Sequence, residues 1–146
     1  MQIIKRYWRI VFPIIIAIII WAFSAQSGEA SDAESLRYAE SFGISNIAMR
    51  KIAHIILFGA FGYSLCSYIK GLYPYVFPTY NLVAYAAIIG IVYGAIDEVH
   101  QLTVIGRSAL VSDVFIDALG VACGILIYII IFCFWRLFRI HSFQQK

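Results

Sequence analysis

The sequence predicts an all-α membrane protein with four transmembrane helices, and composition is the first reason. Hydrophobic residues make up 62% of the 146 residues, and the mean hydropathy is +0.85. Soluble domains are only about half apolar. Four long apolar runs follow one another along the chain, and the charged residues, 13% of the total, lie mainly between them. This composition leaves no segment for a separate soluble domain.

The four apolar runs correspond to spans at about residues 8–25, 50–69, 80–98 and 112–135. A helix needs about 20 residues to cross the hydrocarbon core, and each run reaches that length with its polar or aromatic flanks. The first run also resembles a secretory signal because basic residues precede it. Its cleavage would leave only three spans, so we interpret it as a helix of the mature protein. Residues 1–146 are therefore expected to form a single membrane domain.

The basic residues favour a cytoplasmic location for both termini, because Lys and Arg are enriched on the cytoplasmic side of spans. With the N-terminus inside, seven basic residues lie on the inner side and four on the outer side: Lys5, Arg6, Arg9, Lys70, Arg136, Arg139 and Lys146 against Arg37, Arg50, Lys51 and Arg107. Residues 97–117 then lie at the extracytoplasmic face of the cell membrane. The basic residues are too scattered for a nucleic-acid surface, so the expected partner is the bilayer, and the sequence does not specify an oligomeric state.

A short interfacial helix is predicted in the first outer loop. Ser31 and Glu34 have the spacing of a capping box, and Gly43 would end the helix. A weak apolar stripe follows helical spacing at Ala33, Leu36, Ala39 and Phe42. The four acids of this segment, Glu29, Asp32, Glu34 and Glu40, are interpreted as a solvated face, and a rim that attracts cations is the alternative.

The polar stretch at residues 97–117 carries most of the candidate functional residues. Gly90 and Gly94 share a helix face with Asp97 and Gln101, and Gly120 and Gly124 share one with Asp113 and Asp117, because these positions step by three or four residues. Glycines spaced four apart permit close approach of membrane helices. Both helices should therefore direct their carboxylates toward a helix interface and away from lipid.

The outer end of the second span adds a lysine and a histidine. Lys51 and His54 are three residues apart and share a helix face. They should lie at the depth of the carboxylates. The sequence therefore predicts a polar pocket that opens outward, built from Asp97, Asp113 and Asp117 with Lys51 and His54.

Several short motifs together resemble the VanZ-like family of small multi-pass bacterial membrane proteins, over nearly the whole chain. They are Ser24-Ala25-Gln26-Ser27, Arg50-Lys51-x-x-His54, Asp97-Glu98-x-His100-Gln101, Gly106-Arg107 and Asp113-Val114-x-x-Asp117-x-x-Gly120. The resemblance implies an association with resistance to glycopeptide antibiotics, teicoplanin especially. The sequence departs from the family at Asp117, where asparagine is frequent, and this departure adds a carboxylate.

Binding at the cell envelope is the favoured function. An outward pocket at membrane level with Arg107 at its rim suits an amphiphile with a polar or phosphorylated head, because arginine pairs well with phosphate. A lipid-linked cell-wall precursor or a glycopeptide would fit such a pocket. The predicted ligand-binding residues are Lys51, His54, Asp97, Glu98, Gln101, Arg107, Asp113 and Asp117.

An enzyme that acts on an envelope lipid or precursor is the alternative. Carboxylates and imidazoles at one site can perform acid–base catalysis or hold a metal that activates water. The candidate catalytic residues are His54, Asp97, Glu98, His100 and Asp113. A divalent cation is the cofactor that such side chains would take, with Asp97, Glu98 and His100 as weak metal candidates, although their spacing matches no established metal motif. An interior ion-pair network and an ion-coupled carrier are further hypotheses, the carrier the least favoured.

Overall fold

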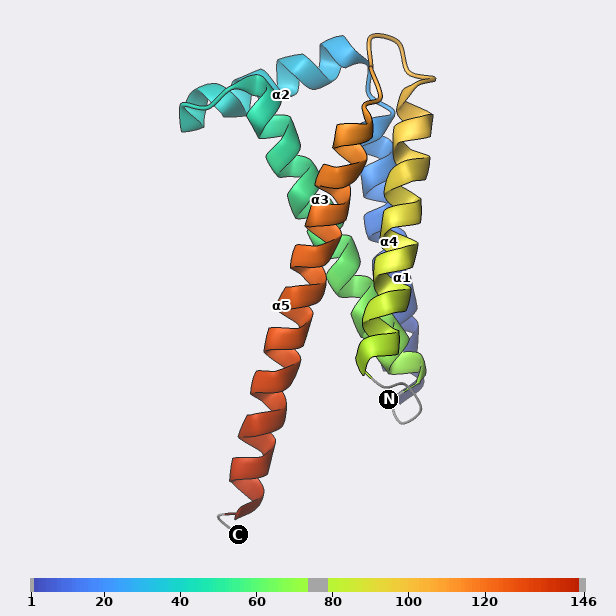
Figure 1. The fold of residues 1–146 in the computed structure, drawn as a ribbon, viewed down its shortest axis with the longest axis vertical. Helices are drawn as coiled ribbons and strands as arrows, with labels where there is room; N and C mark the ends of the chain where they lie inside the picture. The colour runs from blue at the N-terminus through green and yellow to red at the C-terminus, as the bar shows by residue number, and fades with distance from the viewer. Residues whose placement is uncertain (1, 74–78, 145–146) are drawn as a thin grey trace.

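The protein is all-helical over the residues that the computed structural model describes, which are 2–73 and 79–144, with side chains for 9–73 and 80–138. Five helices and no strand occur in these ranges (Figure 1). The helices are α1 (Gln2–Ser24), α2 (Gly28–Phe42), α3 (Asn46–Leu72), α4 (Thr79–Gln101) and α5 (Val111–Gln144). The all-α prediction is thus confirmed.

Three or four of these helices can cross a membrane. Within the described residues, α3, α4 and α5 are each long and apolar enough. The last part of α1 and the whole of α2 meet the same criterion together, but they meet at an angle of 105°. The span predicted at residues 8–25 corresponds to the α1 part of this bent pair, so the predicted four spans are the upper end of what the helices allow.

The α2 helix lies across one end of the bundle, and the loop that joins α4 to α5 lies at the same end (Figure 1). The start of α1 and the end of α5 lie at the opposite end (Figure 1). This arrangement fits an even number of crossings. Four basic residues used in the orientation prediction, Lys5, Arg6, Arg139 and Lys146, fall outside the described side chains.

The α2 helix begins earlier than its predicted capping box. Its N-cap is Ser27, whose hydroxyl accepts a hydrogen bond from the amide of Ala30. Ser31 already donates its own amide to the carbonyl of Ser27, and therefore lies inside the first turn. The predicted cap at Ser31 is wrong because Ser27 takes that role at the bend after α1. The predicted end is confirmed: Gly43 caps the helix with a left-handed φ of 65°.

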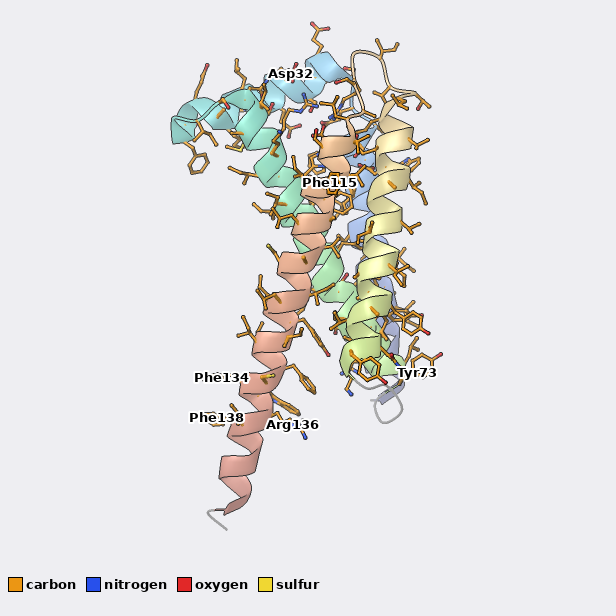
Figure 2. The ribbon with its side chains drawn as sticks, in the orientation of Figure 1. Asp32, Tyr73, Phe115, Phe134, Arg136 and Phe138 are labelled. Carbon is orange, nitrogen blue, oxygen red and sulfur yellow. The ribbon has the colours of Figure 1, made fainter. Side chains whose placement is uncertain are left out.

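The core of the bundle is built from α1, α3, α4 and α5. Its buried residues are Ile16, Ile20, Phe58, Phe61, Leu65, Cys66, Ile69, Leu82, Ala86, Val121 and Ile125. Toward its C-terminal end α5 separates from the other helices, where the exposed side chains of Phe134 and Phe138 project from it (Figure 2). Such a surface is suited to lipid, because the bilayer is itself apolar.

The glycines of α5 permit its close crossing with α3. A Cβ at Gly124 would collide with the carbonyl of Gly59, and one at Gly120 would lie 2.8 Å from the carbonyl oxygen of Ile55. This glycine pair therefore packs on α3. Contact between α4 and α5 uses Gly94, where an added Cβ would lie 3.1 Å from the Cβ of Asp117. Asp97 and Asp117 are both buried, so the predicted inward face of the carboxylates is confirmed for these two residues.

We expect Gly124→Ala to destabilise the α3–α5 crossing. Its new methyl group has no space against the α3 backbone, and overpacking of this kind costs about 1–3 kcal/mol. Gly59→Ala is the matched control, because its Cβ would meet its nearest atom at 3.4 Å and the change gains about 1 kcal/mol of helix propensity. Thermal unfolding in detergent should show a clear loss for Gly124→Ala alone. Equal losses for both variants would contradict the close approach at this point.

Candidate functional site

Four ionisable side chains from three helices meet near the α2 end of the bundle. They are His54 from α3, Asp97 and Glu98 from α4, and Asp117 from α5, and each offers one atom within 4.8 Å of the others. We call these four residues the acidic cluster. The carboxylates are almost inaccessible, since Asp97, Glu98 and Asp117 are 0%, 4% and 0% exposed. Side chains of this kind are almost never fully buried without compensation, so the arrangement calls for a physical explanation.

Hydrogen bonds hold one oxygen of each α4 carboxylate. The Oδ2 atom of Asp97 accepts a bond of 2.7 Å from the hydroxyl of Ser24 and one of 3.0 Å from Nε2 of Gln101. The same amide nitrogen donates to Oε1 of Glu98 at 3.2 Å. Gln101 is itself buried, because it follows these acids by one helical turn and turns toward them. Ser24 at the end of α1 and Gln101 in the last turn of α4 thus orient these two carboxylates.

The third carboxylate is held by the histidine. Nδ1 of His54 lies 2.9 Å from Oδ1 of Asp117. When Asp117 is ionised, Nδ1 is the donor of this bond, because an ionised carboxylate only accepts hydrogen bonds. The pair joins α3 to α5 close to the place where their glycines let the helices cross. Buried Asp117 therefore orients a half-buried imidazole.

The second oxygen of each carboxylate in the acidic cluster has no donor among the described side chains and backbone groups. Within the described part of the chain, Oδ1 of Asp97, Oε2 of Glu98 and Oδ2 of Asp117 are buried and accept no hydrogen bond. An unsatisfied buried polar group costs about 1–3 kcal/mol, and more if it is charged. Three such oxygens on three neighbouring acids indicate a site that a proton, a cation or a ligand completes.

The basic residues predicted to balance these acids lie elsewhere. Among the described residues, the ion pairs are Arg50 with Asp32 and His54 with Asp117, so Lys51 and Arg107 pair with neither of the central aspartates. Lys51 is exposed. The hypothesis of an interior ion-pair network built on these two basic residues is therefore wrong.

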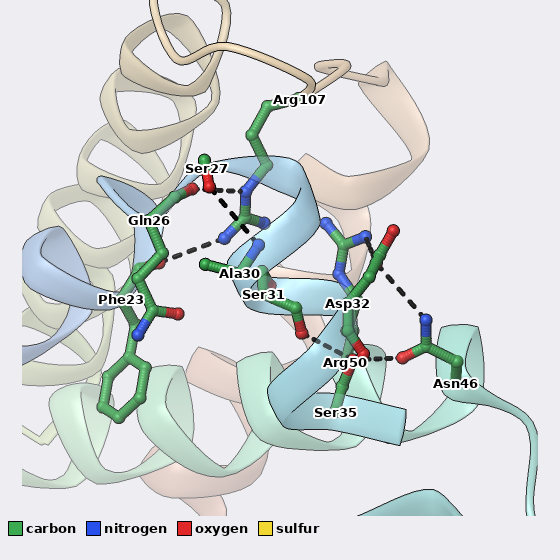
Figure 3. A network of polar contacts seen from close by, with 10 residues as sticks. All are labelled: Phe23, Gln26, Ser27, Ala30, Ser31, Asp32, Ser35, Asn46, Arg50 and Arg107. Atoms are coloured by element: carbon green, nitrogen blue, oxygen red, sulfur yellow. Dashed lines mark hydrogen bonds and ion pairs between the residues drawn. The ribbon is translucent and has the colours of Figure 1, made fainter. Parts of the chain in front are cut away.

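Arg107 instead stabilises the bend between α1 and α2. Its Nε donates to the carbonyl of Gln26 at 3.1 Å, and its Nη2 donates to that of Phe23 at 3.0 Å (Figure 3). These carbonyls lie at and just beyond the C-terminal end of α1, where the negative end of the helix dipole favours a cation. Burial lowers the pKa of the Arg107 guanidinium from its usual value, and the charge of Arg50 acts in the same direction. Arginine nevertheless stays charged in proteins.

The loop after α4 fits against this bend through a glycine pair. The amide of Gly28 donates to the carbonyl of Ile105 at 3.0 Å, and a Cβ at Gly28 would collide with the backbone of Gly106. Gly106 has a φ of +75°, a conformation that favours glycine. The Gly106-Arg107 motif therefore docks the loop onto the start of α2.

A second polar network attaches α2 to the beginning of α3. Oδ1 of Asp32 lies 2.9 Å from Nη1 of Arg50 and accepts a bond of 3.3 Å from Nδ2 of Asn46 (Figure 3). The hydroxyl of Ser35 donates to the amide oxygen of Asn46 and to the carbonyl of Ser31. The acidic face of α2 is thus partly occupied by internal contacts rather than wholly solvated.

Two of the candidate catalytic residues, His100 and Asp113, lie outside the acidic cluster. The ring of His100 stacks on Trp21 with 3.7 Å between ring centroids, and its Nδ1 is buried without a partner among the described residues. Asp113 is half-buried and accepts a hydrogen bond from the hydroxyl of Ser112. The predicted pocket is therefore divided: Asp97, Asp117 and His54 meet, whereas Asp113 lines a neighbouring cavity.

Two cavities reach the acidic cluster from different sides. A cavity of about 370 Å³ lies between α1, α2 and α3, and its lining includes Ser24, His54 and both Arg50 and Arg107. A second cavity of about 280 Å³ lies between α3, α5 and the α4–α5 loop, with His54, Gln101, Lys51, Arg50, Ser108 and Asp113 in its lining. His54 borders both spaces and is the member of the cluster best placed to meet a ligand.

Sequence reasoning missed Ser24 and Arg50 as members of the site. The available signal for Ser24 is its place in the motif with Gln26 and Ser27. Its contact with Asp97 joins residues 73 positions apart, which helical spacing cannot show. Arg50 sits one turn before His54 and lines both cavities.

The fold and the site define a class: an all-helical membrane protein whose bundle buries a cluster of acids and a histidine at one end. A family model described as VanZ/LLP1 matches residues 9–133, and the chain belongs to this family. No curated protein and no solved structure matches the chain. Membership fits a membrane protein linked to resistance. Residues of four motifs that carry the resemblance lie in the acidic cluster or bond to it: Ser24, His54, Asp97 and Asp117.

We expect Arg107→Ala to loosen the bend between α1 and α2 without separating the four residues of the acidic cluster. The change removes two hydrogen bonds to the end of α1, and bonds from a charged donor are worth about 1.5–3 kcal/mol each. Hydrogen exchange should become faster in residues 24–30 and 102–110. Exchange rates as slow as those of the wild type would contradict this capping role. Arg37→Ala, on the exposed side of α2, is the matched control and should leave these segments protected.

Proposed function

We propose that the protein binds an amphiphilic ligand of the cell envelope, a lipid-linked cell-wall precursor or a glycopeptide, at the α2 end of its bundle. Binding there contributes to resistance of the teicoplanin type. The α2 end faces the extracytoplasmic side of the cell membrane in this proposal, as the distribution of basic residues favours. The observation that carries the proposal is the cavity between α1, α2 and α3.

This cavity combines an apolar wall with basic and acidic groups. Its apolar lining comes from Ile20 and Phe23 on α1 and from Ile56, Leu57 and Phe58 on α3. Ligand pockets are mostly apolar, with a few polar groups that set orientation. An acyl or isoprenoid chain would lie along the apolar wall, since burying each CH₂ group contributes about 0.8 kcal/mol.

The polar head would meet two guanidinium groups. Arg50 and Arg107 both line the cavity, and each has N–H groups beyond those that its internal hydrogen bonds use, because arginine carries five. Such groups recognise phosphate and carboxylate oxygens. The interfacial helix α2 covers this part of the cavity with Glu34, Ser35 and Tyr38, which supply further donors and acceptors for sugar or peptide groups.

We expect Ala53→Phe to block the cavity. Ala53 lines it beside His54 on the exposed side of α3, so a phenyl group would occupy the space of the ligand without disturbing the core. Binding of the lipid-linked precursor and of teicoplanin to the full chain in nanodiscs should weaken at least tenfold, and teicoplanin tolerance of expressing cells should fall. Ala84→Phe, exposed on α4 away from the cavity, is the matched control. Unchanged binding in Ala53→Phe would contradict the proposal that the ligand binds in this cavity.

An acid–base enzyme that acts on an envelope lipid is the second candidate function. The observation in its favour is the His54–Asp117 pair, a buried carboxylate that orients an imidazole on the wall of two cavities. An imidazole held in this way suits general base catalysis. Chemistry would then change the covalent structure of the bound molecule, which binding alone does not.

Mass spectrometry of lipid-linked precursors and peptidoglycan fragments separates the two functions. For an enzyme, we expect a mass change in cells with the wild type that disappears in His54→Gln at equal protein levels. His100→Gln, which alters an imidazole outside the acidic cluster, should keep the change. Identical profiles in all three strains, together with a difference in teicoplanin tolerance, would favour binding and exclude the enzyme.

A further inference from the structure

We infer that the acidic cluster is a binding site for one divalent transition-metal ion, Mn²⁺ or Zn²⁺, held by His54, Asp97, Glu98 and Asp117. Each residue offers one atom, and the four atoms lie within 4.8 Å of one another. The site draws on three helices, so an ion there would tie α3, α4 and α5 together. The inference stands whether the protein binds an amphiphile or performs chemistry.

The first argument is that each of the three acids has one hydrogen-bonded oxygen and one free oxygen. One oxygen of each acid is engaged: Oδ2 of Asp97 by Ser24 and Gln101, Oε1 of Glu98 by Gln101, and Oδ1 of Asp117 by His54. The other oxygen of each acid is buried and accepts nothing from the described residues. Metal-binding carboxylates and imidazoles are usually oriented by such outer contacts.

The balance of charge is the second argument. Three neighbouring carboxylates bring up to three negative charges into a space where the described residues supply no lysine or arginine partner. Taking an ion out of water is costly even after the protein relaxes. A divalent cation would offset two of these charges and satisfy the three free oxygens. Protonation would neutralise the acids but leave their added O–H groups in need of acceptors.

The ligand types select the metal. Carboxylates suit Mn²⁺ and other hard cations, whereas an imidazole favours transition metals over Mg²⁺ and Ca²⁺. Three oxygens and one nitrogen therefore point to Mn²⁺ or Zn²⁺. The cavities reach His54, Gln101 and Ser24, which provides a route for an ion and for a ligand atom that would complete its coordination.

The test is metal binding by the full chain purified in detergent. After removal of metals by a chelator, titration with Mn²⁺ and with Zn²⁺ should show one ion per chain by calorimetry and by elemental analysis. Bound metal should raise the melting temperature, and renewed chelation should reverse the rise. Asp97→Asn and Asp117→Asn should weaken binding on the order of 100-fold or abolish it. Ser24→Ala, which removes an outer contact, should weaken it about tenfold.

Glu40→Gln is the matched control, because Glu40 is an exposed acid of α2 that lines neither cavity, and it should bind as the wild type does. Absence of stoichiometric binding of both metals to the wild type would overturn the inference, whatever the variants do. Binding that survives both Asp97→Asn and Asp117→Asn would also overturn it, since the ion would then lie elsewhere. Circular dichroism of the metal-free variants checks their folding, which should persist because each change removes a buried charge.

Discussion

Burial of three carboxylates at one end of an apolar bundle is the constraint on which the rest of this structure depends. Acids at that depth need donors, and three of the four helices that build the core supply them. Ser24 comes from α1, His54 from α3 and Gln101 from α4. The second oxygen of each of these acids has no donor among the described residues, and because unpaired buried charge is costly, we infer a metal site there.

Helix packing and the site are two consequences of the same small residues. The crossing of α5 on α3 at Gly124 and Gly59 brings the beginning of α5 close to His54. Gly94 lets α4 approach Asp117. Larger side chains at these places would separate the helices and with them the members of the acidic cluster. The glycines thus act on function through the distance between backbones.

The basic residues of the α2 end build the frame around the cluster. Arg107 joins the α4–α5 loop to the bend after α1, and Arg50 joins α3 to α2. Both side chains also line the larger cavity. Their structural contacts hold α2 over the end of the bundle, and their remaining N–H groups add basic groups to a cavity that also reaches Ser24 and His54. A ligand with an apolar chain and an anionic head would match the apolar wall and the two arginines of this cavity.

The helical membrane class, the long apolar helices, the short helix after the first of them and the inward direction of Asp97 and Asp117 were predictable from the sequence. Hydropathy and helical periodicity are local properties, so they can be taken directly from the order of residues. The tertiary structure was needed to bring Ser24 to Asp97, to separate Asp113 and His100 from the acidic cluster, and to show that Arg107 caps α1. These contacts join residues from separate helices, whose relative rotation and bend angle depend on packing and not on spacing along the chain.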